Sequence, residues 1–142
     1  MLRALLTFSL GVAIGAGGLF AAQKFSRSGD KPIFIAVDGD TVKINAIRVL
    51  NQRLRAKGFD TPEIRHAKCA KEREAGLRMK QRLQSAIDQG RFTAELTGRR
   101  AGFGRPEAVF KIDGEDIAET WVKEKLAVRW KRGRKPDWCS RL

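Results

Sequence analysis

The feature that most constrains the fold is an uncharged, almost wholly apolar segment from Ala4 to Ala22. A helix over this segment would be about 28 Å long at ~1.5 Å per residue, close to the ~30 Å hydrocarbon core of a bilayer. A cleaved export signal has a shorter apolar region and a small-x-small cleavage site, which Ala16-Gly17-Gly18 could supply. A buried core helix is disfavoured because its glycines would weaken it in water. We therefore expect residues 1–22 to be either a signal anchor, a single transmembrane helix through residues 4–22, or a removed signal peptide.

Behind this segment we expect a polar linker (residues 23–31) and a single basic domain (residues 32–142). The chain has 29 Lys and Arg residues against 16 Asp and Glu, a net charge of +13. Such a surplus favours an anionic partner: nucleic acid, phosphate or an acidic membrane surface. One histidine and two cysteines exclude a multi-histidine or four-cysteine metal site within one chain.

The hydrophobic pattern of residues 32–142 predicts an α+β domain that is mainly β. Extended stretches are expected at residues 32–37, 41–44, 47–59, 91–96 and 107–112, and helices at 69–89 and 116–127. Asp-Gly turns follow the first and last of these strands. This order suits a small, five-stranded, closed barrel of the OB type with two to three helices. The expected core contacts of the two helices are Gly76, Met79, Leu83, Ala86 and Ile87, and Ile117, Trp121 and Leu126.

The two cysteines, Cys69 and Cys139, are far apart in the sequence and do not form a C-x-x-C pair. In an oxidising compartment we expect them to form one disulfide that ties the C-terminus to the domain. Closing a loop of this length would stabilise the fold by about 4 kcal/mol. The alternative is a pair of unrelated buried thiols.

Two acidic motifs and two arginines stand at the ends of the expected strands. Asp38-Gly39-Asp40-Thr41 lies at a hairpin turn, and Asp60-Thr61-Pro62-Glu63 closes the third extended stretch, five residues after Arg55. Gly104-Arg105 precedes a later strand. Taken singly, each has an ordinary structural explanation, as turn chemistry, a helix cap or a solvated arginine.

Taken together, and in this order, the motifs resemble the staphylococcal nuclease (thermonuclease) family. The resemblance covers about residues 32–142, and the spacings of the motifs are close to those of the family. The late helix with Lys125-Leu126-Ala127 and the terminal Trp138-Cys139 also look like bacterial members. It implies an exported, Ca²⁺-dependent nuclease with a monomeric catalytic domain, which hydrolyses phosphodiester bonds of DNA or RNA. The enzyme would be membrane-anchored, or periplasmic or secreted if the N-terminal segment is removed.

The resemblance also implies a site for one Ca²⁺ ion. Asp40 and Asp60 would supply carboxylate ligands and Thr61 its backbone carbonyl, in keeping with the preference of this hard cation for oxygen. Asp38 would be a neighbouring carboxylate that orients the site.

The catalytic residues implied by the resemblance are Glu63, Arg55 and Arg105. Glu63 would position or deprotonate the attacking water. Arg55 and Arg105 would clamp the phosphate from opposite sides and stabilise the charge that grows on its oxygens. Substituting either arginine is then expected to reduce turnover far more than fold stability.

The chain departs from the family in its nucleotide pocket. It has no tyrosine, and Phe103 stands where a tyrosine is expected; its ring could stack on a base without the hydroxyl hydrogen bond. Ala101 replaces an acidic residue, and Pro106-Glu107 follows Arg105. Trp130 is either a second stacking group or a partly buried amphipathic residue.

Other residues have less specific interpretations. His66 is expected in a solvated loop, and the basic clusters at Arg99-Arg100 and at residues 129–135 could follow a nucleic-acid backbone, contact anionic lipid or be solvated. Two alternatives to the nuclease stay open. One is a non-catalytic OB module that binds nucleic acid or another polyanion, and the other is a nuclease-like domain recruited to an envelope role such as exopolysaccharide biosynthesis.

Overall fold

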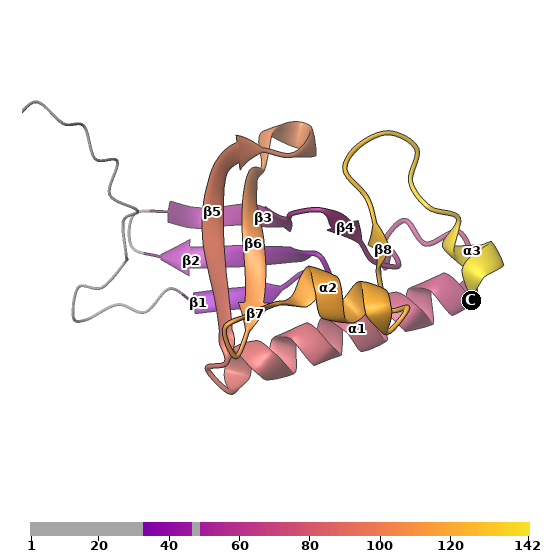
Figure 1. The fold of residues 1–142 in the computed structure, drawn as a ribbon, viewed down its shortest axis with the longest axis horizontal. Coiled ribbons are helices and arrows are strands. Elements are labelled where there is room, and N and C mark those ends of the chain that lie inside the picture. Colours follow the sequence, from indigo (N-terminus) through magenta and orange to yellow (C-terminus); the bar gives the residue numbers. More distant parts are fainter. Residues whose placement is uncertain (1–32, 47–48) are drawn as a thin grey trace, which may run out of the picture.

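The computed structural model describes residues 33–46 and 49–142 (Figure 1). The expected anchor or signal (residues 1–22) and linker (residues 23–31) lie outside the described residues. Among the residues that are described, no helix is long and apolar enough to cross a membrane. The described part is an α+β fold, mainly strands, in which one curled sheet is covered by helices.

The main sheet has the strand order β1-β2-β3-β6-β5, and β7 pairs with β6. Its strands are β1 (Ile33–Ala36), β2 (Thr41–Ala46), β3 (Val49–Ala56), β5 (Phe92–Arg100), β6 (Pro106–Ile112) and β7 (Glu115–Asp116). All neighbours are antiparallel except β3 and β6, which run parallel. The sheet curls so that β5 and β6 cross over β1–β3 (Figure 1), and the rings of Phe34 on β1 and Phe92 on β5 lie 5.1 Å apart. It is a half-barrel: among the described residues, no ladder pairs β1 with β5.

The stretch 47–59, expected as one strand, is divided in two. β3 ends at Ala56, and β4 (Phe59–Asp60) pairs instead with β8 (Val128–Arg129) in a separate two-stranded sheet. Gly58 lies between them with φ +80°, a left-handed conformation that interrupts an extended strand. This break brings Asp60 beside the C-terminal part of the chain.

Three helices accompany the sheet: α1 (Ala70–Asp88), α2 (Ile117–Lys123) and α3 (Trp138–Arg141). α1 agrees with its expected range, and its Met79, Leu83 and Ala86 are buried. α2 ends four residues earlier than expected, because Lys125 has φ +61° and turns the chain out of the helix. Leu126 is therefore half-buried and lies beyond the helix.

The core lies between the inner face of the curled sheet and helices α1 and α2. Phe59, Phe110, Trp121, Leu83 and Val42 are its largest fully buried apolar side chains. Ring pairs at 6.0 Å (Phe59–Trp121) and 5.3 Å (Phe92–Phe110) meet edge to face. Each such buried side chain contributes about 1.5–3 kcal/mol to folding. The buried Phe59 side chain thus anchors β4, and with it the neighbouring Asp60, in the core.

Candidate functional site

The two acidic motifs meet in the folded chain. Asp40 follows the tight turn between β1 and β2, and Asp60 ends β4; they are only 3% and 0% exposed. The Thr61 amide donates to Asp40 Oδ2 at 3.0 Å, and the Thr41 hydroxyl donates to Oδ1 at 3.1 Å. A hydrogen bond from backbone to carboxylate therefore joins the DTPE loop to the DGDT turn.

Arg55 is the buried counter-ion of these carboxylates. Its guanidinium forms ion pairs with Asp40 and, at 2.9 Å, with Asp60, and donates to the Phe59 carbonyl at 3.2 Å. Burial lowers the pKa of Arg55, while the charges of Asp60 and Asp38 raise it. Because Arg55 is only 3% exposed, its guanidinium faces the acidic residues and not solvent.

Asp38 supports the turn from one side. Its Oδ1 accepts a hydrogen bond from the Asp40 amide at 3.1 Å. Burial raises the pKa of Asp38, and this is opposed by the positive charges of Arg55, Lys135 and Arg105 and by a hydrogen bond from Thr41. Asp38 therefore lies near enough to all three cations to be stabilised in its charged form by them.

The loop that carries Glu63 is held by helix α1. The Glu63 amide donates to the buried Glu72 carboxylate at 3.3 Å, and the Lys68 amide donates to it at 2.7 Å. Gly76 approaches the loop so closely that a Cβ there would lie 2.8 Å from the carbonyl oxygens of Pro62 and Glu63. The position of Glu63 therefore depends on how α1 packs.

The side chain of Thr61 packs closely against the backbone of Gly39. A Cβ on Gly39 would lie 2.8 Å from the Thr61 hydroxyl oxygen. That oxygen is buried and has no hydrogen-bond partner among the described residues. A glycine is therefore required in the DGDT turn for the two motifs to meet.

Sequence reasoning missed the C-terminal contribution to the site. The Trp138 indole N–H donates to Asp60 Oδ2 at 3.0 Å. Lys135 Nζ lies 3.0 Å from Asp60 Oδ1 and also forms an ion pair with Glu63. Lys135 lies in the basic cluster at residues 129–135 and Trp138 precedes Cys139, but sequence reasoning assigned neither of them to the site. The expected pairing of Cys139 with Cys69 was the signal that brings this end of the chain close to the DTPE loop.

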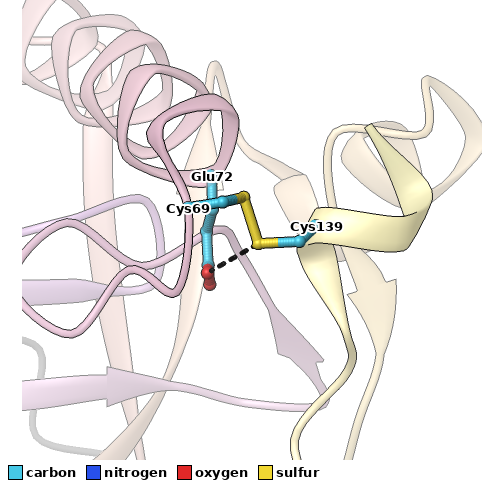
Figure 2. A group of neighbouring side chains, drawn as sticks. All are labelled: Cys69, Glu72 and Cys139. Carbon is cyan, nitrogen blue, oxygen red and sulfur yellow. Dashed lines mark hydrogen bonds between the residues drawn. A yellow bond between two sulfur atoms is a disulfide. The ribbon is translucent and has the colours of Figure 1, made fainter.

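A disulfide does join Cys69 and Cys139, with Cα atoms 6.1 Å apart (Figure 2). It links the start of α1 to α3. The Glu72 carboxylate lies 3.8 Å from the Cys139 sulfur, so Cys69, Glu72 and Cys139 form a group that could hold a metal by proximity alone. The sulfurs are bonded to each other, however, and so are not the thiolates that a metal requires.

The remaining site residues lie at the rim. Trp130 is half-buried, with its ring centre 5.4 Å from the Arg55 guanidinium and 5.9 Å from Lys135 Nζ. The Arg105 guanidinium donates to the Gly102 carbonyl at 3.0 Å and lies 5.8 Å from the ring of Phe103, which is fully exposed. Arg105 makes no direct contact with the carboxylates, but its charge acts on Asp38 and Arg55. His66 is exposed, as expected.

The cluster keeps a net negative charge. Three carboxylates, those of Asp40, Asp60 and Glu63, form ion pairs with two cations, Arg55 and Lys135. One negative charge is therefore not neutralised by these two cations, and Asp38 adds a further carboxylate. An oxygen-rich, net negative cluster near the half-buried Arg105 can attract a hard cation and, through it, a phosphate group.

Comparison with known proteins assigns no family to the chain. No protein-family model matches it, and no curated protein matches it either.

Proposed function

We propose that the chain is a member of the staphylococcal nuclease family and a Ca²⁺-dependent nuclease that hydrolyses phosphodiester bonds of DNA or RNA. One observation carries this proposal: Asp40 of the DGDT turn and Asp60 of the DTPE loop converge on Arg55, and Glu63 of the same loop joins the cluster through Lys135. A stable core does not need such a cluster, because buried ion pairs contribute little net stability compared with apolar packing.

The donor set fits a hard divalent cation. All its donors are oxygens, and its carboxylates outnumber the cations that contact them. Asp40, Asp60 and the Thr61 carbonyl are the residues that would hold Ca²⁺. When bound, the ion would neutralise phosphate charge and help to orient the phosphate for attack.

The chain's own residues divide the remaining tasks. The Glu63 side chain is 25% exposed, against 0% for Asp60, and is therefore the carboxylate that can reach a water molecule and take its proton. Arg105 stands at the rim and would bind the phosphate oxygens as their charge grows. Arg55 would hold Asp40 and Asp60 in place and supply positive charge from the buried side of the site.

The fold and the N-terminal segment belong to the same proposal. The order β1-β2-β3-β6-β5, with only β3 and β6 parallel, supports an OB-type barrel with thermonuclease-like topology over residues 32–142. The apolar segment at residues 4–22 supports export, followed by membrane anchoring or by release into the periplasm or the medium.

One observation favours a second candidate, a non-catalytic module that binds nucleic acid or another polyanion. The carboxylate oxygens of Asp60 already accept hydrogen bonds from Arg55 and Trp138 and form an ion pair with Lys135, so the cluster is a connected network without a metal. Such a module would bind through its basic surface alone and would need no metal.

Parallel cleavage and binding assays separate the two candidates. The full chain, in non-ionic detergent because of residues 4–22, is incubated with fluorescent single-stranded DNA and RNA in Ca²⁺ or in a chelator. A nuclease cleaves only with Ca²⁺, and Glu63→Gln reduces the rate by about 100-fold or more. Glu74→Gln, an exposed change on α1, should leave the rate unchanged. Salt-dependent binding without cleavage would select the binding module.

A further inference from the structure

Lys135 places an ammonium group inside the acidic cluster. Its Nζ lies 3.0 Å from Asp60 Oδ1 and forms an ion pair with Glu63, while Asp60 itself is 0% exposed. A single cation thus bridges two carboxylates from either side of the DTPE loop. It occupies the kind of position, between convergent carboxylate oxygens, that a bound metal ion requires.

The two cations of the cluster differ in how firmly they are held. Arg55 contacts Asp40, Asp60 and the Phe59 carbonyl, and its side chain is 4% exposed. The Lys135 side chain is 42% exposed, and its ion-pair partners are the carboxylates of Asp60 and Glu63. A long, flexible side chain of this kind can turn out into water at little cost, whereas moving Arg55 would leave buried charges unpaired.

Lys135 lies in a loop that is fixed at both ends, and this loop holds it beside the acidic cluster. This C-terminal loop (residues 130–137) begins where the Trp130 amide donates to the Gly58 carbonyl at 3.0 Å. It ends at Trp138, whose indole binds Asp60, and at the disulfide of Cys139 (Figure 2). Both anchors are independent of the Lys135 side chain, so the loop would stay in place if that side chain turned away.

The indole ring of Trp130 lies close to both cations, Arg55 and Lys135. Its ring centre is 5.4 Å from the Arg55 guanidinium and 5.9 Å from Lys135 Nζ, within range of cation–π attraction. Its indole N–H donates to the Arg134 carbonyl at 3.3 Å, which fixes the loop next to Lys135.

We propose that Lys135 is a displaceable internal counter-ion, which occupies the acidic site in the metal-free protein and is expelled to solvent when a divalent cation binds. This inference rests on the proposed metal site, at which Lys135 would compete with the divalent cation for the carboxylates. Lys135 lowers the apparent affinity for the cation while keeping Asp60 and Glu63 paired in its absence.

Calorimetric titration of the full chain with Ca²⁺ tests the inference. Lys135→Gln should bind Ca²⁺ about five- to tenfold more tightly than wild type, the combined effect of removing the two ion pairs with Asp60 and Glu63. Lys131→Gln removes the same charge from the same loop and should change the affinity less than twofold. Equal affinities for wild type and Lys135→Gln, or equal tightening in both variants, would overturn the inference and leave the proposed function intact. Absence of Ca²⁺ binding in all three proteins would overturn both.

A second readout uses the wild-type chain alone. An amine-reactive reagent should label Lys135 faster as Ca²⁺ saturates the site, while Lys131 labelling stays constant, in solutions of matched ionic strength. Mass spectrometry of the digested protein measures both rates. Labelling of Lys135 that is unchanged or slower in saturating Ca²⁺ would contradict its displacement.

Discussion

Arg55 shows how burial changes the expected effect of a substitution. From the sequence, its loss should affect turnover more than stability; in the structure its guanidinium compensates two buried carboxylates. We predict that Arg55→Gln lowers the free energy of unfolding by about 3–5 kcal/mol, since Asp40 and Asp60 lose their buried partner. Urea denaturation measures the change.

Arg105→Gln is the matched control, because this guanidinium donates to a carbonyl of its own turn and lies near the exposed ring of Phe103. Its free energy of unfolding should stay within about 0.5 kcal/mol of wild type. Similar losses of stability in the two variants would contradict the division into a buried counter-ion and a rim arginine.

Trp138 and Trp130 form a natural comparison, since each donates one indole hydrogen bond. Trp138→Phe keeps the ring but removes the donor to the buried Asp60 carboxylate, and should cost about 1.5–3 kcal/mol of stability. Trp130→Phe removes a donor to the Arg134 carbonyl at an exposed position, and should cost less than about 1 kcal/mol. Thermal unfolding of both variants measures this; the reverse order would show that Asp60 does not depend on Trp138.

The residues of the candidate site divide by how they could be found. Asp40, Asp60 and Glu63 are visible in the sequence because short motifs keep each functional carboxylate next to its turn residues. Lys135 and Trp138 are not, because the pairing of β4 with β8, which brings the C-terminal loop to Asp60, involves only two residues in each strand. Pairings this short have no periodicity that a sequence could display.

At the scale of elements, the packing of α1 against the DTPE loop sets the place of Glu63. A methyl group on Gly76 would meet two backbone carbonyls at 2.8 Å. Gly76→Ala should therefore cost about 1–3 kcal/mol through overpacking, despite the better helix propensity of alanine. Gln81→Ala, on an exposed position of the same helix, should be neutral or slightly stabilising. Equal unfolding midpoints for Gly76→Ala and wild type would contradict this close approach.

The disulfide links α1 to α3 across 70 residues of sequence. Reducing it should lower stability by about 4 kcal/mol, mainly because the unfolded chain gains freedom. Guanidinium denaturation with and without a thiol reductant measures the loss. The double variant Cys69→Ser, Cys139→Ser should have the stability of the reduced wild type and should not respond to reductant. An unchanged midpoint on reduction of the wild type would show that the link adds no stability.

The elements that the sequence predicts well are those with long, regular patterns. α1 and the β1–β2 hairpin agree with expectation, because a long amphipathic stripe and an Asp-Gly turn specify them locally. The end of α2 and the break after β3 were not foreseen, because both depend on single residues with positive φ, Lys125 and Gly58. The four-residue α3 contains Cys139 of the disulfide and is too short for a sequence pattern to specify.

At the scale of the whole molecule, the residues of the candidate site lie at one end of the curled sheet. The turn after β1, β4 and the C-terminal loop meet there, while α1 and α2 close the core (Figure 1). The chain has a net charge of +13, so a polyanion attracted to it would meet the proposed cation site in this acidic cluster. This combination, in our interpretation, is what separates a nuclease from a simple basic binding protein.

The rate of single-stranded DNA cleavage across a Ca²⁺ titration tests the central proposal most directly. The full chain should cleave with a rate that saturates in Ca²⁺ and falls to background in excess chelator, and oxygen from labelled water should appear in the phosphate of the product. Glu63→Gln should reduce the saturated rate by about 100-fold or more. A rate at background across the whole titration, or a Ca²⁺-dependent rate that Glu63→Gln leaves unchanged, would contradict the assignment of this cluster as the nuclease site.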